Sequence, residues 1–296
     1  MKELWGKPVA ESFYLQLEEE SAHFIEQTGH IPSLAVILIG SDPASATYVA
    51  MKEKACERLG FTHKSYHFEE SISEEQILAL LTELNNDFEI DGILVQLPLP
   101  DHIRTEIVLE TIHPEKDVDG FHPMNIGKLL LGTPALISCT PLGILKMLEY
   151  YKIETEGKHV VVVGRSNIVG KPIAALLVQQ GWDATVTICH SKTKNLSEIT
   201  NQADILIVAI GRAHFITPDF VKEGAIVIDV GINRLADASR TRGYRLVGDV
   251  DYENIAAKTK AITPVPGGVG VMTVAMLMNN TYQAAKRKHH EAEVLA

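Results

Sequence analysis

The segment YVAMK contains a tyrosine and a lysine, Tyr48 and Lys52, that are four residues apart. On a helix this spacing places both side chains on one face. The tyrosine ring offers a stacking surface, and a lysine held among apolar neighbours can have its pKa lowered into the range useful for acid–base catalysis. An amphipathic surface pair has the same spacing, so the chemical interpretation needs support from other segments.

Three other segments provide that support. Gln96 closes the run GILVQLPLP at the carboxyl end of an expected strand, where open α/β sheets bind ligands, and it could hydrogen-bond a lysine amine without adding charge. The loop KDVDG places Asp117 and Asp119 two residues apart, although turn formation explains Asp117 as well as function does. The glycine-rich run PVPGGVG, residues 264–270, allows backbone to approach a ligand closely.

A dinucleotide site is indicated by the segment HVVVVGRSNIVGKP, residues 159–172. A strand that ends in a tight glycine turn and opens a helix directs backbone N–H groups and the helix dipole at a pyrophosphate. The segment departs from G-x-G-x-x-G because Ser166 takes the middle place and the last glycine, Gly170, comes one residue later. A plain tight turn between a strand and a helix remains the alternative.

The end of the next expected strand, ATVTICH, distinguishes NADP from NAD. Enzymes that use NAD commonly place an acidic residue there for the ribose hydroxyls, but this chain continues with His190, Ser191 and Lys192. A carboxylate would repel a 2′-phosphate, whereas Ser191, Lys192 and Arg165 would attract it. We therefore predict NADP, against the alternative of a solvated lysine-rich turn.

Helices and strands alternate along the chain, which predicts an α/β fold with parallel sheets and crossover connections. The expected elements of the first part are helix 8–28, strand 34–39, a helix bounded by Asp42, Pro43 and Gly60, strand 63–68, helix 74–85 and strand 92–96. In the second part we expect strands 160–163, 185–188, 205–209 and 226–229 and a final helix 271–286.

Two domains with a cleft between them follow from this order. Residues 1–120 with about 271–296 form an N-terminal substrate and catalytic domain, residues 140–270 form a Rossmann-type nucleotide domain, and residues 121–139 connect them. In this prediction the catalytic domain is discontinuous.

Charge and composition exclude several classes of partner. The formal charge of −11 argues against a nucleic-acid or anionic-membrane partner, and the apolar runs are too short to cross a bilayer. The N-terminus has no pattern of a secretory signal. The cysteines Cys56, Cys139 and Cys189 have no paired spacing, which predicts a reducing compartment, the cytoplasm.

We predict no metal site, and we expect Cys139 to be a buried structural residue. His63 and His67 share a face of an expected strand but lie too far apart to chelate. Cys139 precedes a helix expected near Pro141, whose dipole could lower a thiol pKa.

Several motifs recur in the order of a known family: YVAMK, VQLPLP, KDVDG, CTPLGILKML, GRSNIVGKP, CHSKT, DVGIN, GDVD and PVPGGVG. Together they resemble the bifunctional methylenetetrahydrofolate dehydrogenase/methenyltetrahydrofolate cyclohydrolases of the FolD type. The resemblance implies that 5,10-methylenetetrahydrofolate gives a hydride to NADP and that the methenyl product is hydrolysed to 10-formyltetrahydrofolate. It also implies a homodimer joined through the nucleotide domains.

The resemblance assigns roles to individual residues. Lys52 matches the essential lysine, Tyr48 the ring that stacks on the folate, Gln96 the partner of the lysine and Asp119 the acid at the pterin edge, while Arg165 and Ser191 match the pair that holds the 2′-phosphate. The full predicted cofactor set is Gly164, Arg165, Ser166, Ile168, Val169, Gly170, His190, Ser191, Gly211 and Ile232. The predicted substrate set is Tyr48, Lys52, Gln96, Leu97, Asp119, Pro266, Gly267 and Gly268.

Two segments depart from the family pattern, and three other functions are alternatives. Val271 stands where proline is common, and GRAHF, residues 211–215, replaces Gly-Lys-Pro. A short-chain dehydrogenase also uses Tyr-x-x-x-Lys, but its glycine loop comes first in the chain. A monofunctional dehydrogenase stays open. A non-catalytic folate or NADP binding module would be favoured by loss of Lys52 or Asp119, and both are present.

Overall fold

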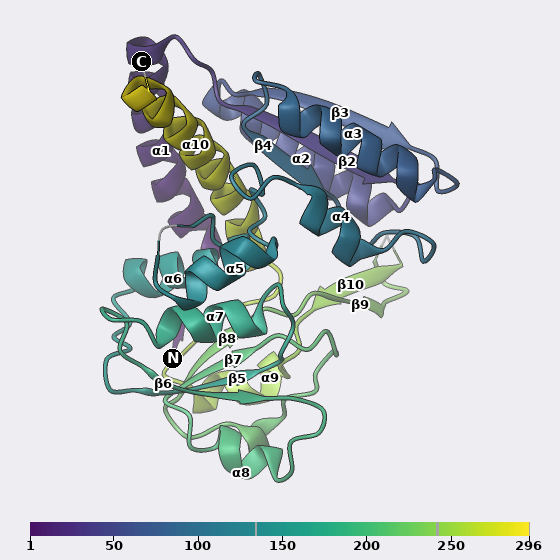
Figure 1. The fold of residues 1–296 in the computed structure, drawn as a ribbon. Coiled ribbons are helices and arrows are strands. Elements are labelled where there is room, and N and C mark those ends of the chain that lie inside the picture. Colours follow the sequence, from purple (N-terminus) through teal and green to yellow (C-terminus); the bar gives the residue numbers. More distant parts are fainter. Residues whose placement is uncertain (134, 241–242, 296) are drawn as a thin grey trace. The chain divides into compact units, whose positions relative to one another are not determined.

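The computed structural model describes residues 1–133, 135–240 and 243–295, and it divides into two compact units (Figure 1). The lysine unit comprises residues 13–139 and the C-terminal helix from Val274 onward. The glycine-loop unit comprises residues 1–12 and 140–273. Residue 134 of the predicted connecting segment and residues 241, 242 and 296 of the predicted domains lie outside the described residues.

The lysine unit contains a three-stranded parallel sheet in the order β3-β2-β4. Every residue of the central strand β2 is buried, which explains its uninterrupted apolar sequence. Helix α3 packs Ile77, Leu81 and Leu84 against this sheet. The elements wholly within the unit are β2 (Ser33–Ile39), α2 (Pro43–Leu59), β3 (Thr62–Phe68), α3 (Glu74–Asn86), β4 (Gly92–Val95), α4 (Thr105–Thr111) and α5 (Pro123–Leu130).

The ends of α2, which carries Tyr48 and Lys52, confirm the signals predicted from sequence. The carboxylate of Asp42 accepts a hydrogen bond from the Ser45 N–H, and the helix begins at Pro43. Its last residue, Leu59, is followed by Gly60, whose φ of 69° is left-handed and whose N–H donates to two carbonyls of the last turn. Both ends of the helix are therefore fixed by local residues.

The glycine-loop unit contains a six-stranded parallel sheet in the order β1-β11-β8-β7-β5-β6. The chain goes from β5 outward to β6 and then returns to β7 on the other side of β5. This reversal is the topological switch point at which open α/β sheets bind ligands. The strands are β1 (Lys2–Glu3), β5 (His159–Val163), β6 (Thr185–Cys189), β7 (Ile205–Val208), β8 (Ile226–Asp229) and β11 (Ala261–Ile262).

The remaining elements of this unit are helices and one hairpin. The hairpin β9 (Asn233–Ala236) and β10 (Tyr244–Val247) forms a separate two-stranded sheet. The helices are α6 (Cys139–Tyr150), α7 (Gly170–Leu177), α8 (Leu196–Thr200) and α9 (Tyr252–Ile255). Two further helices, α1 (Gly6–Thr28) and α10 (Gly270–Leu295), begin in this unit and continue into the lysine unit. No helix within the described ranges combines the length and the apolar character that a bilayer span requires.

The two units differ from the predicted domain boundaries in two places. Residues 1–12 group with the glycine-loop unit because β1 pairs with β11. Residues 121–139 belong to the lysine unit, where the Asn125 side chain donates to the Pro114 carbonyl and to Asp117. Strands of two residues have no periodicity, so the sequence pattern contained no sign of β1 or β11.

Candidate active site

Lys52 and Gln96 are brought together by the lysine unit. Lys52 lies on α2 and is only 8% exposed, and its Nζ donates a hydrogen bond of 2.8 Å to Oε1 of Gln96. The Gln96 Nε2 donates to the carbonyl of Leu97 at 2.8 Å, which fixes the orientation of the amide. Gln96 therefore presents an uncharged acceptor to the lysine.

Burial of Lys52 favours the neutral form of its amine. Burial lowers the pKa of Lys52, and the nearby Asp119 opposes part of that shift. Asp119 is partly exposed, yet burial of its carboxyl raises its pKa to about 6, against the opposing effect of Lys52. An amine and a carboxyl whose pKa values are both moved towards neutrality can exchange protons with a bound substrate.

Tyr48 lies one turn before Lys52 on α2, and 36% of its surface is exposed. The next residue, Val49, is buried, so α2 is anchored beside an accessible aromatic ring. This exposure is what a stacking role requires.

Three buried residues hold the segment that carries Asp119. Asp117 accepts hydrogen bonds from the His122 N–H at 2.8 Å and from Asn125 at 2.9 Å, so its carboxylate shapes the turn. The Cys139 thiol donates to the Val118 carbonyl, and burial raises the pKa of this thiol well above its ordinary value. Asn280 on α10 donates to the same carbonyl at 2.8 Å. The prediction for Asp117 left turn formation and function open, and the contacts show turn formation.

The glycine loop after β5 approaches other backbone closely. A Cβ on Gly164, whose φ is 133°, would lie 2.2 Å from the Ala209 carbonyl oxygen, and a Cβ on Gly170 would lie 2.2 Å from the Gly164 oxygen. The Ser166 hydroxyl accepts from the N–H groups of Val169 and Gly170 at 3.1 and 3.3 Å. Glycine is therefore required at both places, and Ser166 in the middle place closes the turn that opens α7.

Neighbouring parallel strands place the predicted 2′-phosphate residues at one edge of the sheet. Strands β5 and β6 are paired in parallel, so Arg165 after β5 and Ser191 after β6 both follow carboxyl ends. Arg165, Ser191 and Lys192 are exposed. The turn is fixed by His190, whose N–H donates to Thr193 and whose Nδ1 accepts from the Lys192 N–H. This set of donors fits an anionic dinucleotide, with Ile168 exposed beside it.

The remaining predicted residues lie in loops of the glycine-loop unit. Gly211 follows β7 with a φ of 67°, and Ile232 follows β8 and is 45% exposed. The loop of Pro266, Gly267 and Gly268 is tied to the start of α1, because the Gly6 N–H donates to the Gly267 carbonyl at 2.8 Å. These three predicted substrate residues therefore belong to a different unit from Lys52.

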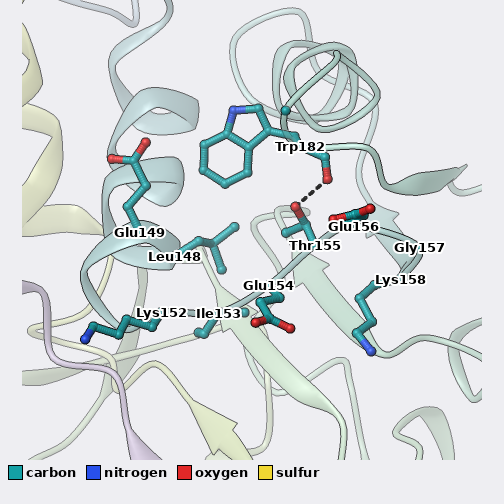
Figure 2. A pocket seen from close by; sticks show the side chains of 11 residues that line it. Leu148, Glu149, Lys152, Ile153, Glu154, Thr155, Glu156, Gly157, Lys158 and Trp182 are labelled. Atoms are coloured by element: carbon teal, nitrogen blue, oxygen red, sulfur yellow. Dashed lines mark hydrogen bonds between the residues drawn. The ribbon is translucent and has the colours of Figure 1, made fainter.

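One cavity of about 760 Å³ lies away from every predicted residue (Figure 2). Its lining includes Glu149, Glu154, Lys158 and Trp182, and the Thr155 hydroxyl donates to the Trp182 carbonyl at 2.6 Å. Lys158 and Trp182 precede β5 and β6, so this cavity lies at the amino ends of the strands. Ligands of such sheets bind at the carboxyl ends, and the cavity is not part of the candidate site.

Both parts of the chain match models of one known family. A model of the tetrahydrofolate dehydrogenase/cyclohydrolase catalytic domain matches residues 4–119, and the NAD(P)-binding domain of the same family matches residues 138–289. The chain belongs to the tetrahydrofolate dehydrogenase/cyclohydrolase family. Both domains of the family are present, which confirms the predicted α/β fold class and the predicted dinucleotide-binding domain.

Individual relatives are similar over nearly the whole chain. The bifunctional protein FolD of Campylobacter curvus is 54% identical over 288 residues, which cover 97% of each chain. The crystal structure of the bifunctional enzyme FolD from Campylobacter jejuni has a TM-score of 0.91 and 50% identity, covering 97% of this chain and 99% of that one. The Trypanosoma brucei FolD structure, described as complexed with NADP cofactor and an inhibitor, has a TM-score of 0.91 and 38% identity, covering 96% of this chain and 97% of that one.

The family assignment confirms the resemblance that the motifs predicted, but sequence reasoning missed several residues that organise the site. Asn280 was not singled out, although an asparagine within the apolar run VAMLMNN of a buried helix needs a polar partner. The acids of DVGIN and GDVD, Asp229 and Asp249, served only as family motifs. Both are buried, which is unusual for aspartate and indicates a specific role.

Proposed function

We propose that the chain oxidises 5,10-methylenetetrahydrofolate with NADP and then hydrolyses the methenyl product to 10-formyltetrahydrofolate. The observation that carries this proposal is the buried Lys52, hydrogen-bonded at 2.8 Å to a neutral glutamine, in a chain of the tetrahydrofolate dehydrogenase/cyclohydrolase family.

For the oxidation the protein has to position two reactants. Bound NADP would supply the acceptor for the hydride that leaves the methylene carbon of the folate. Gly164 and Gly170 allow backbone N–H groups to approach the pyrophosphate, and Arg165, Ser191 and Lys192 supply donors and positive charge for the 2′-phosphate. No protein acid or base is needed in this step, so its rate depends on orientation and electrostatics.

For the hydrolysis a protein base is required. Water adds to the cationic amidinium carbon of the methenyl compound and must lose a proton, which the neutral Lys52 amine can accept. The resulting ammonium can return that proton to the ring nitrogen as its bond to the carbon breaks, and the remaining hydroxyl proton is released to solvent as the formyl carbonyl forms. A permanently charged lysine would repel the cationic substrate, so the lowered pKa of Lys52 and the uncharged Gln96 both favour the reaction.

The other predicted site residues support the folate side of this proposal. Tyr48 offers its exposed ring for stacking, and Asp119 offers a carboxyl to the pterin edge. Leu97 directly follows Gln96, and its carbonyl accepts the hydrogen bond that orients the Gln96 amide. Pro266, Gly267 and Gly268 provide a loop whose backbone can approach the substrate.

The assignment is tested with purified protein, 5,10-methylenetetrahydrofolate and either NADP or NAD. Reduced cofactor and the methenyl intermediate are followed together by absorbance. We expect reduction with a preference for NADP, followed by decay of the intermediate. Failure to reduce either cofactor would overturn the dehydrogenase assignment.

The variant Lys52→Met separates the bifunctional from the monofunctional enzyme. Loss of a general base lowers rates by about 10²- to 10⁴-fold, so hydrolysis of supplied methenyltetrahydrofolate should fall by that factor. NADP binding should stay within twofold of wild type by calorimetry. Unchanged hydrolysis in a folded variant would remove Lys52 from the mechanism.

We further propose a homodimer that works in the cytoplasm. The three cysteines are free and buried, which fits a reducing compartment. Light scattering coupled to size exclusion measures the mass in solution, and a monomer across the micromolar range would contradict the dimer.

A further inference from the structure

Asp249 gathers the loop that follows strand β7. The residue is fully buried, and its Oδ2 accepts hydrogen bonds from the N–H groups of Ile210 and Gly211 at 2.7 and 2.9 Å. Its Oδ1 accepts from the Arg212 N–H at 2.8 Å. Three consecutive backbone donors therefore converge on one carboxylate, which fixes the course of residues 210–212.

The same carboxylate also contacts the first residue of β9, at the end of the loop that follows β8. Asn233 donates through Nδ2 to Oδ1 of Asp249 at 2.9 Å. The last residue of β8, Asp229, accepts through Oδ1 from the N–H groups of Gly231 and Asp249 at 2.9 and 3.0 Å and through Oδ2 from Val250 at 2.9 Å. The two acids thus tie the segment 248–250 to the ends of both strands.

Two glycines are required by the close approach of these carboxyls. A Cβ on Gly248 would lie 1.8 Å from Oδ2 of Asp229, and a Cβ on Gly231 would lie 2.3 Å from the carboxyl carbon of Asp249. Asp229 therefore packs on Gly248, which directly precedes Asp249. Asp249 packs in turn on Gly231, two residues after Asp229. This reciprocal packing gives a physical reason for the motifs DVGIN and GDVD.

Backbone donors take the place of a cation beside this pair. Within residues 1–133, 135–240 and 243–295, neither acid has a salt bridge to lysine or arginine, and the guanidinium of Arg212 lies over the Phe215 ring at 4.6 Å. Burial, with a contribution from Asp249, raises the pKa of Asp229 to about 7. Four N–H donors reach the carboxyl oxygens of Asp249, and three reach those of Asp229.

We propose that Asp249 is a positioning residue that sets the two loops, residues 210–212 and 230–233, against the nicotinamide half of NADP. In a parallel sheet of this order the loop after β5 takes the pyrophosphate, and the adenosine half lies towards β6. The loops after β7 and β8, on the other side of the switch point, then face the nicotinamide half. The inference rests on the proposed function, since it uses the predicted cofactor contacts of Gly211 and Ile232.

The variant Asp249→Asn tests this role, because the amide has nearly the same shape but turns one acceptor into a donor facing N–H groups. We expect NADP affinity to fall at least tenfold by calorimetry, and hydride transfer at saturating substrates to fall similarly. Binding of adenosine 2′,5′-bisphosphate, which lacks the nicotinamide half, should stay within twofold. Hydrolysis of supplied methenyltetrahydrofolate, measured without NADP, should also stay within twofold.

Asp251→Asn is the matched control. Asp251 lies two residues after Asp249, and its carboxylate accepts a hydrogen bond from the nearby Asn254 at 2.8 Å. This variant should leave all four measurements unchanged. If Asp249→Asn does not fold, Asn233→Ala removes one of the four donors and should shift the NADP affinity in the same direction by a smaller factor.

Two results would overturn the proposal. One is unchanged NADP affinity and hydride transfer in a folded Asp249→Asn or Asn233→Ala variant. The other is an equal loss of NADP binding, bisphosphate binding and hydrolysis, which would indicate a general structural role. A wild-type protein that binds NADP but transfers no hydride would contradict the proposed function instead. The role of Asp249 would then still be tested by comparing how the variant binds NADP and adenosine 2′,5′-bisphosphate.

Discussion

Replacing Gln96 by glutamate places a negative charge against Lys52 with almost no change in shape. The amide oxygen accepts from Lys52 Nζ at 2.8 Å, so the new carboxylate would form an ion pair in a largely buried setting. Two unit charges about 4 Å apart in an effective dielectric constant of about 20 attract each other by about 4 kcal/mol. That energy corresponds to a rise of about three units in the pKa of Lys52.

The sign of the effect on hydrolysis follows from which form of Lys52 acts as the base. The neutral amine accepts the proton, and a raised pKa makes this form scarcer at any pH below it. At neutral pH the Gln96→Glu variant should therefore hydrolyse methenyltetrahydrofolate up to about 1000-fold more slowly, because three pKa units correspond to that factor. The rising limb of the pH–rate profile should move to higher pH.

The assay is the decay of methenyltetrahydrofolate absorbance at closely spaced pH values for wild type and variant. Gln96→Met is the matched control, because it removes the hydrogen bond without adding charge and should lower the rate without raising the midpoint. NADP binding, measured on the same samples, should be unchanged in both variants. A Gln96→Glu profile with the wild-type midpoint would refute the reasoning, whatever happened to the maximal rate.

Three other predictions follow from contacts described by the structure. Asp91 is buried and accepts from the Ser33 N–H, from His30 and from Lys288 at 2.8 to 3.0 Å, so Asp91→Ala should lower the free energy of unfolding in urea by about 3 kcal/mol; a loss below about 0.5 kcal/mol would contradict it. Ser191→Glu places a carboxylate where the 2′-phosphate is expected and should reduce the preference for NADP over NAD at least tenfold, about 1.4 kcal/mol, with unchanged preference as the opposing result. The pKa of Asp119 is raised by burial from 3.8 to about 6, so the stability that depends on its protonated form is complete below 3.8 and is lost as the pH rises to about 6. Asp119→Asn should remove that fall, and a constant difference between the two urea unfolding curves from pH 4 to 7 would count against it.

Local signals made much of the lysine unit predictable. Asp42, Pro43 and Gly60 mark the ends of α2 because their effects involve only residues in the adjacent helical turn. The apolar run of β2 reflects burial of that strand on both faces. The spacing of Tyr48 and Lys52 placed them one turn apart, and the hydrogen bond between Lys52 and Gln96 matches the expected pairing. The individual roles of these residues in catalysis stay predictions.

Contacts between distant parts of the chain could not be predicted in this way. Asp249 accepts from residues 37 to 39 positions earlier, and no periodicity relates a loop to an acid at that separation. The pairing of β1 with β11 joins residues near opposite ends of the sequence through only two residues on each side. Such features depend on the assembled sheet, so they carry no pattern of their own in the sequence.

The passage of the chain from one unit to the other inside α1 and α10 has a practical consequence for engineering. Neither unit can be excised as a cassette, because any cut at the boundary would fall within a continuous helix and leave unpaired N–H and carbonyl groups at a new terminus. Limited proteolysis, which favours exposed loops, should nick this chain without releasing either unit intact. Cofactor preference in this scaffold must therefore be redesigned residue by residue in place, and grafting a nucleotide domain from another dehydrogenase is the wrong strategy.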